Sequence, residues 1–301
     1  MDISSIRLFV LVATRLSYGT AAAEMDIDPS SVSRKIKNLE TELGGQLFNR
    51  STRSMALSNF GARFLKHAEF ILREYDLAIE NAKGENESLK GTLKITTSIA
   101  FADRMLVPLI PKFMELYPEI SVNLVPSDEN LDLATEAIDV AIRLTPQVNG
   151  NYVITKLFRT RYAIYATPDY VKKHGVLKSP FELSERDTIL YELPGFKSHW
   201  KFRSKDNKDK EFLVDIKGKV AVKSPAILRK MVLLGQGPSM LADWLVRRDV
   251  EEGKLVDILP GFEVTPITFD TGAWVLYPNN AYTPKKVKTF INFIKSELGE
   301  F

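Results

Sequence analysis

Hydroxyl and cationic side chains that could contact a nucleic acid gather between residues 30 and 53. Serines and basic residues near the start of a helix can reach the base edges and phosphates in a DNA groove. Two further arginines follow this segment, where they could meet the phosphate backbone or the minor groove. The residues that we expect to contact DNA are Ser30, Ser31, Ser33, Arg34, Lys37, Arg50 and Arg53.

The charge distribution supports this interpretation in part. Residues 31–66 carry seven Lys/Arg and two Asp/Glu, a balance of 7 − 2 = +5, whereas residues 1–90 carry 12 of each kind. A basic face on a neutral background is typical of a phosphate-binding surface. A merely solvated surface would show the same charges, so the pattern by itself leaves both interpretations open.

Other chemistry has little support in the sequence. Cys is absent, which excludes thiolate ligands, disulfides and thiol catalysis, and the three histidines lie far apart at His67, His174 and His199. No Gly-rich phosphate loop, Ser-His-Asp order or paired set of metal ligands is present. We therefore expect no catalytic residues, no metal and no cofactor, and a protein that is not an enzyme.

The sequence predicts that three short helices followed by a hairpin position these cations. Apolar residues from Ile3 to Leu16 recur at helical spacing, and a small-residue run around Ala21-Ala22 allows close approach of a second helix. Asp28-Pro29 favours the start of a third helix, with Asp as N-cap and Pro at the first position. Residues 47–58 are typical of a short wing with Arg50 and Arg53 beside its tip.

In order and spacing, this segment resembles the N-terminal signature of LysR-type transcriptional regulators. The residues that carry the resemblance are Ser17, Tyr18, Ala21, Ala22, Val32, Ser33, Arg34, Ile36, Leu39, Glu40, Leu43, Gly44, Leu47, Phe48, Arg50, Arg53, Leu57, Ser58 and Gly61. The resemblance implies a bacterial regulator that binds double-stranded operator DNA through a winged helix-turn-helix. Many members have Gln then Pro where this chain has Pro29 then Ser30, so base discrimination would fall to Ser30, Arg34 and Lys37.

A long helix is expected from residue 59 to about residue 83. Its apolar residues follow a heptad pattern, which suits packing either on its own domain or against a second subunit. We favour the second, and the resemblance also implies a linker-helix dimer, so the expected assembly is a homodimer or homotetramer. The seam would consist of Phe64, Ala68, Ile71, Tyr75 and Ala78, and residues 84–90 read as a polar hinge.

Residues 91–301 alternate strands with helices, which predicts an α/β fold with a largely parallel sheet. The resemblance implies a two-lobed effector domain similar to periplasmic solute-binding proteins. Lobe 1 would span about 91–161 and 268–301, and lobe 2 about 162–267. The expected domains are thus 1–58 for DNA binding, 59–90 for the linker and 91–301 for the effector.

A small anionic or polar effector is expected between the lobes, near Ser98 and Ser224. Each of these serines stands where a strand gives way to a helix, and such junctions offer free N–H groups to a carboxylate or phosphate. Both serines could instead be simple helix caps. The resemblance adds Ser127, Arg143 and Phe196 as effector contacts, and we include Phe101 beside Ser98.

Two other classes of protein would share parts of this pattern. A solute-binding transport protein would have the same α/β half, but with an export signal and without a helix-turn-helix. A structural DNA-binding protein with a non-functional cleft would show no ligand response. No run approaches the ~20 apolar residues of a membrane span, and Asp2 precedes the short apolar run at residues 6–13. We therefore expect a cytoplasmic protein without a membrane partner.

Overall fold

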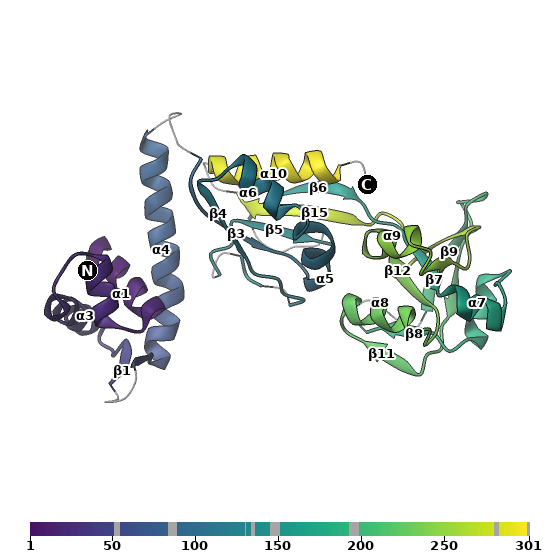
Figure 1. Cartoon of the computed structure of the whole chain (residues 1–301), viewed down its shortest axis with the longest axis horizontal. Coiled ribbons are helices and arrows are strands. Elements are labelled where there is room, and N and C mark those ends of the chain that lie inside the picture. The colour runs from purple at the N-terminus through teal and green to yellow at the C-terminus, as the bar shows by residue number, and fades with distance from the viewer. Residues whose placement is uncertain are drawn as a thin grey trace. The chain divides into compact units, whose positions relative to one another are not determined.

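The computed structural model forms two compact units, one built on Met1–Ser88 and the other comprising most of Leu89–Phe301 (Figure 1). Residues 1–50, 55–83, 89–129, 131–133, 136–144, 151–192, 199–279 and 283–299 are described by the structure. Within these ranges, no helix has the length and apolar character needed to cross a membrane.

The first unit is a helical headpiece with a two-stranded wing and a long final helix. Helices α1 to α3 pack through an apolar core centred on Phe9, Val12, Ile36 and Leu39, none more than 2% exposed. Strands β1 and β2 are antiparallel. The elements are α1 (Ile3–Arg15), α2 (Tyr18–Glu24), α3 (Pro29–Leu43), β1 (Phe48–Arg50), β2 (Met55–Leu57) and α4 (Asn59–Lys83).

The ends of α3 show how the sequence delimits this helix. Pro29 occupies the first turn, where its missing N–H costs nothing. The Asp28 side chain makes no capping hydrogen bond, contrary to the expectation, and its backbone carbonyl accepts from Ser31 and Val32 instead. At the other end Gly44 adopts the left-handed conformation (φ 70°) that glycine tolerates best.

The second unit contains two large sheets, which define two lobes, and a third sheet of two strands. The lobe 1 sheet has the order β4-β3-β5-β15-β6, with β3 parallel to β4 and β5, and β15 antiparallel to β5 and β6. Its strands are β3 (Gly91–Thr96), β4 (Ile120–Leu124), β5 (Val140–Arg143), β6 (Tyr152–Arg159) and β15 (Gly272–Pro278). Its helices are α5 (Ile99–Phe101), the π-helix η1 (Ala102–Leu106), α6 (Ile110–Leu116) and α10 (Lys285–Leu298).

Helices α6 and α10 lie together on the lobe 1 sheet (Figure 1). The Phe113 ring on α6 meets Phe290 and Phe293 of α10, with ring centroids 5.2 Å apart in both pairs. Leu93 and Ile95 of β3, both fully buried, belong to the same core. The alternation of buried and partly exposed residues from Leu93 to Ile95 therefore places one face of β3 against this core.

The main sheet of lobe 2 has the order β10-β9-β14-β7-β12, with β13 also paired to β7. Its pairings are antiparallel, so the expectation of a largely parallel sheet is wrong for this lobe. Its strands are β7 (Tyr162–Ala166), β9 (His199–Ser204), β10 (Glu211–Asp215), β12 (Ser239–Ala242), β13 (Val256–Asp257) and β14 (Phe262–Thr265). A second, two-stranded sheet pairs β8 (Ile189–Tyr191) with β11 (Val220–Val222). The helices are α7 (Pro168–His174), the 3-10 helix η2 (Pro180–Glu185), α8 (Pro225–Leu233) and α9 (Asp243–Glu251).

Two chain segments connect the lobes, one between β6 and β7 and one between β14 and β15. They are joined to each other, because the Thr160 N–H donates to the Thr271 carbonyl at 3.2 Å and the Thr271 hydroxyl donates to the Thr160 carbonyl at 2.7 Å. The lobes thus share a short double connection, an arrangement that permits hinge motion between rigid bodies.

Candidate functional site

One face of α3 presents hydroxyls and cations to solvent. Ser30, Ser33, Arg34 and Lys37 are exposed and Ser31 is partly exposed, while Val32, Ile36 and Leu39 on the other side are buried. Steps of three and four place the exposed residues on one side of the helix. Across the part of the chain that the structure describes, no carboxylate pairs with Arg34 or Lys37. Their charges are therefore available to an outside anion.

The headpiece fixes α3 from two directions. Ala21 and Ala22 are almost fully buried, so α2 can approach α3 closely. On α3 itself, a Glu40 carboxylate oxygen accepts from the backbone N–H groups of Leu47 at 2.8 Å and Phe48 at 3.4 Å. This charge-assisted contact fastens the helix to the first strand of the wing.

The wing contacts expected from Arg50 and Arg53 are not visible in the described residues. Arg50 ends β1, opposite Met55 in the hairpin register, but its side chain lies outside the described set. Arg53 lies outside it altogether. The role of both arginines at DNA stays a prediction.

The structure divides the expected seam of α4 into two parts. Phe64 packs on Phe9, with ring centroids 5.3 Å apart, and Ala68 is fully buried in the headpiece core, so both serve their own domain and not an outer surface. Ile71 also packs against that core. Tyr75 and Ala78 are exposed, as is Ile79. The second part of α4 thus offers exposed apolar side chains to a partner.

Three parallel strands of lobe 1 end at the same edge of the sheet. Beyond the ends of β3 and β4, the Ser127 N–H donates to the Thr97 carbonyl at 2.8 Å, so these two strands continue side by side. The register of β3 with β5 ends where Thr96 pairs with Ala141, two residues before Ser98 on one strand and two before Arg143 on the other. Three of the expected effector residues, Ser98, Ser127 and Arg143, therefore gather at this edge.

The helix start at Ser98 is already occupied by protein acceptors. The Ser98 hydroxyl accepts from the Phe101 N–H at 3.3 Å, and the Asp128 carboxylate accepts from the Ile99 N–H at 3.0 Å. An anion bound at this helix start would compete with the carboxylate of Asp128. Two of the N–H groups expected to be free are therefore taken, and the effector role of Ser98 stays a prediction.

The remaining expected contacts fall in different environments. Phe101 is fully buried between Phe158 and Trp244, so it is a core residue and not a ligand contact. Ser224 is the N-cap residue of α8 but makes no side-chain capping bond, which leaves its hydroxyl available. Phe196 lies outside the described residues.

The same sheet edge holds polar atoms that have no partner among the described residues. The buried atoms are Thr97 Oγ1, Arg143 Nη2 and Trp274 Nε1, and Trp274 lies directly opposite Arg143 in the register of β15 with β5. Burial lowers the pKa of the Arg143 guanidinium, which nevertheless keeps its charge. Buried donors without acceptors cost free energy, so they mark a place where an acceptor belongs.

Thr97 and Trp274 were not predicted from the sequence. Thr97 has a weak signal, since it adjoins Ser98 at the end of a strand. Trp274 has none, because only the pairing of β15 with β5 brings it to Arg143. The Lys156 ammonium stands 5.2 Å from the centre of the Trp274 ring, but it also pairs with the Asp270 carboxylate at 2.8 Å, which offsets its charge.

Both halves of the chain match known protein families. Residues 3–62 match the family described as bacterial regulatory helix-turn-helix protein, lysR family, and residues 86–299 match the LysR substrate binding domain. The transcriptional regulator CrgA of Neisseria meningitidis is 31% identical over 98% of this chain and 96% of its own length. The regulator PtxR of Pseudomonas aeruginosa is 27% identical over 99% and 94%.

Solved structures agree with these matches over the whole chain. The structure of CrgA, at 29% identity, covers 99% of each chain with a TM-score of 0.62. The full-length structure of the Vibrio cholerae virulence activator AphB, at 25% identity, covers 98% of this chain and 99% of its own, with a TM-score of 0.60.

Proposed function

The chain belongs to the LysR-type transcriptional regulators, and from that premise we propose that its effector is a small carboxylate held at the carboxyl ends of β3, β4 and β5. Regulators of this family bind DNA through the helix-turn-helix, are modulated by an effector and are not enzymes. The proposal names the chemical class of the effector and the residues that hold it.

The observation that carries the proposal is the set of buried donors at the sheet edge. Arg143 Nη2 and Trp274 Nε1 both lack an acceptor among the described residues, and they come from strands paired at those two positions. A guanidinium forms a stronger hydrogen bond with a carboxylate than with a neutral acceptor. The indole N–H can only donate, so it too requires an acceptor on the ligand. The Thr97 and Ser98 hydroxyls could donate to the same ligand.

The DNA-binding role is assigned to the exposed face of α3. Ser30, Ser33, Arg34 and Lys37 combine base-reading groups with charge, and the wing arginines Arg50 and Arg53 would hold phosphates. The exposed row of Tyr75, Ala78 and Ile79 on α4 would meet the same row of a second subunit. The proposed assembly is therefore a homodimer, or a homotetramer built from dimers, on a two-fold symmetric site.

The test begins with a panel of small carboxylates and matched neutral amides, screened for an increase in the Tm of the full chain. A ligand at 100 times its Kd adds about 2.7 kcal/mol to stability. Trp274→Phe removes one donor and keeps an aromatic ring. Because Nε1 has no partner among the described residues, the ligand-free Tm should stay nearly unchanged. Losing a hydrogen bond to a charged group, about 1.5–3 kcal/mol, should weaken carboxylate binding roughly tenfold to a hundredfold.

Trp200→Phe is the matched control, since Trp200 is a buried tryptophan in β9 of lobe 2, away from this sheet edge. It should leave carboxylate affinity unchanged. The proposal would be contradicted by a ligand that binds Trp274→Phe and wild type equally, or by amides that stabilise the protein as well as carboxylates do. A chain whose DNA binding responds to no compound that raises its Tm would favour the structural DNA-binding alternative.

A further inference from the structure

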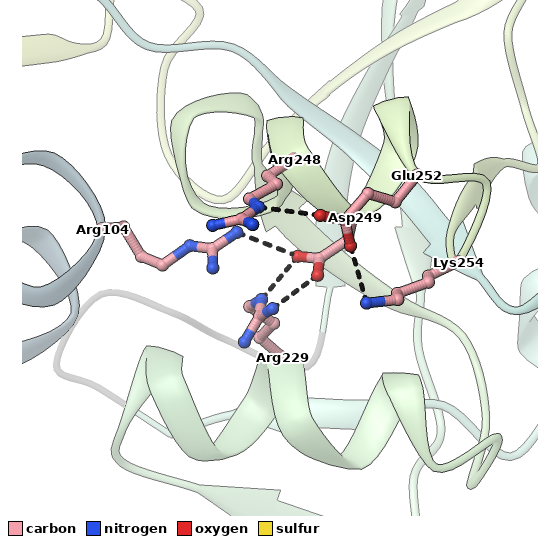
Figure 2. Close-up of polar contacts among 6 residues, drawn as sticks. All are labelled: Arg104, Arg229, Arg248, Asp249, Glu252 and Lys254. Carbon is pink, nitrogen blue, oxygen red and sulfur yellow. Dashed lines mark hydrogen bonds and ion pairs between the residues drawn. The ribbon is translucent and has the colours of Figure 1, made fainter. Parts of the chain in front are cut away.

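Three helices of the second unit converge on one buried carboxylate. Asp249 on α9 is 2% exposed, and both of its oxygens accept from Arg229 on α8, at 2.6 Å from Nε and 2.5 Å from Nη2. A third helix, η1, contributes Arg104, whose Nη2 donates to Oδ2 at 3.3 Å (Figure 2). Arg229 and Asp249 belong to lobe 2 and Arg104 belongs to lobe 1, so this junction joins the lobes.

The two arginines make contacts of unequal strength. Arg229 binds in the bidentate manner, the strong form of an arginine–carboxylate pair, whereas Arg104 makes a single, longer hydrogen bond. If Arg104 leaves, Asp249 keeps a full partner and no uncompensated charge is buried. The Arg104 side chain is 18% exposed, so its guanidinium can be hydrated when it is released. The contact between lobes can therefore open at low cost.

The same helices lead to the sheet edge and to the second expected effector contact. Ser98 caps α5, which runs directly into η1 and thus into Arg104. Ser224 stands at the N-cap of α8, which carries Arg229. A shift of either helix start would move an arginine at Asp249. The π-helical turn of η1 is itself a geometry found often at functional sites.

A second contact between the lobes lies next to the ionic one. The rings of Phe101 in α5 and Trp244 in α9 are 5.3 Å apart, and both residues are almost fully buried. The two rings can rotate slightly against each other without breaking an ion pair or admitting water. This apolar contact can act as the pivot while the Arg104 bond makes or breaks.

We propose that the Arg104–Asp249 bond is a releasable latch between the lobes, through which an event at the sheet edge changes their arrangement. This proposal rests on the proposed function in one respect, because effector binding is the event that would open or close the latch. The Arg104–Asp249 bond itself forms without ligand. Coupling between two binding sites requires a part of the protein that has two discrete states, and the latch is such a part because its bond is either made or broken. Arg229 is the fixed partner that stays paired with Asp249 in both states.

The absence of Cys from the chain makes a direct test practicable. Asn292→Cys on α10 and Lys173→Cys on α7 place spin labels on exposed positions of lobe 1 and lobe 2. The distance distribution between the labels is measured by pulsed electron spin resonance on full-length protein without ligand, with labelled subunits diluted in unlabelled chain. Arg104→Gln should shift or broaden this distribution relative to the labelled parent.

Arg248→Gln is the matched control, because Arg248 lies beside Asp249 on α9 but pairs with Glu252 at 2.7 Å (Figure 2). Its distribution should superimpose on that of the parent. A distribution for Arg104→Gln that also superimposes would overturn the latch. Thermal unfolding adds a second check: Arg104→Gln should lower the Tm much less than Arg229→Gln, and an equal loss would show that Arg104 is structural only.

Failure of this inference and failure of the proposed function can be told apart. The spin-label measurement uses no effector, and Trp274→Phe should leave its distances unchanged. If carboxylates fail to bind at Arg143 and Trp274 while Arg104→Gln still moves the lobes, the latch stands and only the effector assignment falls. If ligand binding depends on Trp274 but Arg104→Gln leaves the distance between the labels unchanged, the effector assignment stands and the latch is refuted.

Discussion

At the scale of single residues, we expect a few side chains on the exposed face of α3 to determine which DNA sequence is bound. Arg34 lies in the middle of that face, and no described carboxylate holds it. Serines cannot make the paired contacts to a base that a guanidinium can. We therefore expect base recognition to depend largely on Arg34.

Arg34→Ala is therefore expected to relax the preference for one base pair of the binding site, at a cost of about 1–3 kcal/mol at that position. Binding sites selected from a random duplex pool by wild type and by variant would give the preference at each position. Lys35→Ala removes a neighbouring exposed cation from another side of the helix and should leave the selected sequence unchanged. An identical site for Arg34→Ala and wild type would refute the base-reading role.

At the scale of elements, the wing and α4 are joined so closely that one position admits only glycine. A Cβ added at Gly61 in the first turn of α4 would lie 2.0 Å from the Leu47 carbonyl oxygen. The Ser58 hydroxyl accepts from the Gly61 N–H at 2.8 Å at the same joint. The wing and the linker helix thus keep a fixed angle, which matters if both subunits are to meet one DNA site.

Gly61→Ala should accordingly destabilise the headpiece, by about 1–3 kcal/mol for an overpacked contact and more if the backbone cannot move. Gly19→Ala is the opposite case: it lies in α2 with only the Ser17 hydroxyl nearby, at 3.8 Å from the added Cβ. It should stabilise the protein by about 0.5–1 kcal/mol through helix propensity. Urea denaturation measures both, and a neutral Gly61→Ala would show that the joint is loose.

At the scale of the whole molecule, we expect function to depend on assembly as well as on the fold of one chain. In α4, the row begun by Ala68 and Leu72 inside the headpiece continues as Tyr75 and Ile79, which are 43% and 40% exposed. Exposed apolar residues that extend a buried row indicate an interaction surface. A second subunit on this surface would place two recognition helices on one duplex.

Ile79→Asp should reduce the mass of the full-length assembly in sedimentation velocity, because a carboxylate in an apolar interface loses its hydration without gaining a partner. Binding to a two-fold symmetric duplex should weaken in parallel. Ala62→Asp is the control, since this exposed position in the first turn of α4 favours an acidic residue. An unchanged mass for Ile79→Asp would exclude this part of α4 from the interface.

Local sequence patterns were sufficient to predict the family, the α/β class and the exposed face of α3. Helix spacing, strand alternation and the ordered signature from Ser17 to Gly61 are properties of neighbouring residues, so they can be read along the chain. They also led to Ser98 at the end of a strand, whereas Ser127 and Arg143 were expected only from the resemblance to the family.

Other features depended on contacts between distant segments. The pairing of β15 with β5 sets Trp274 against Arg143, and the folding of α4 onto the headpiece turns Phe64 and Ala68 inward. Asp249 receives Arg104 and Arg229 from two other helices. Strand register and helix packing are fixed by the summed burial of many side chains. The type of a single residue therefore does not predict which distant residue it will contact. Only the tertiary structure could therefore show which donors remain unpaired and where the lobes are joined.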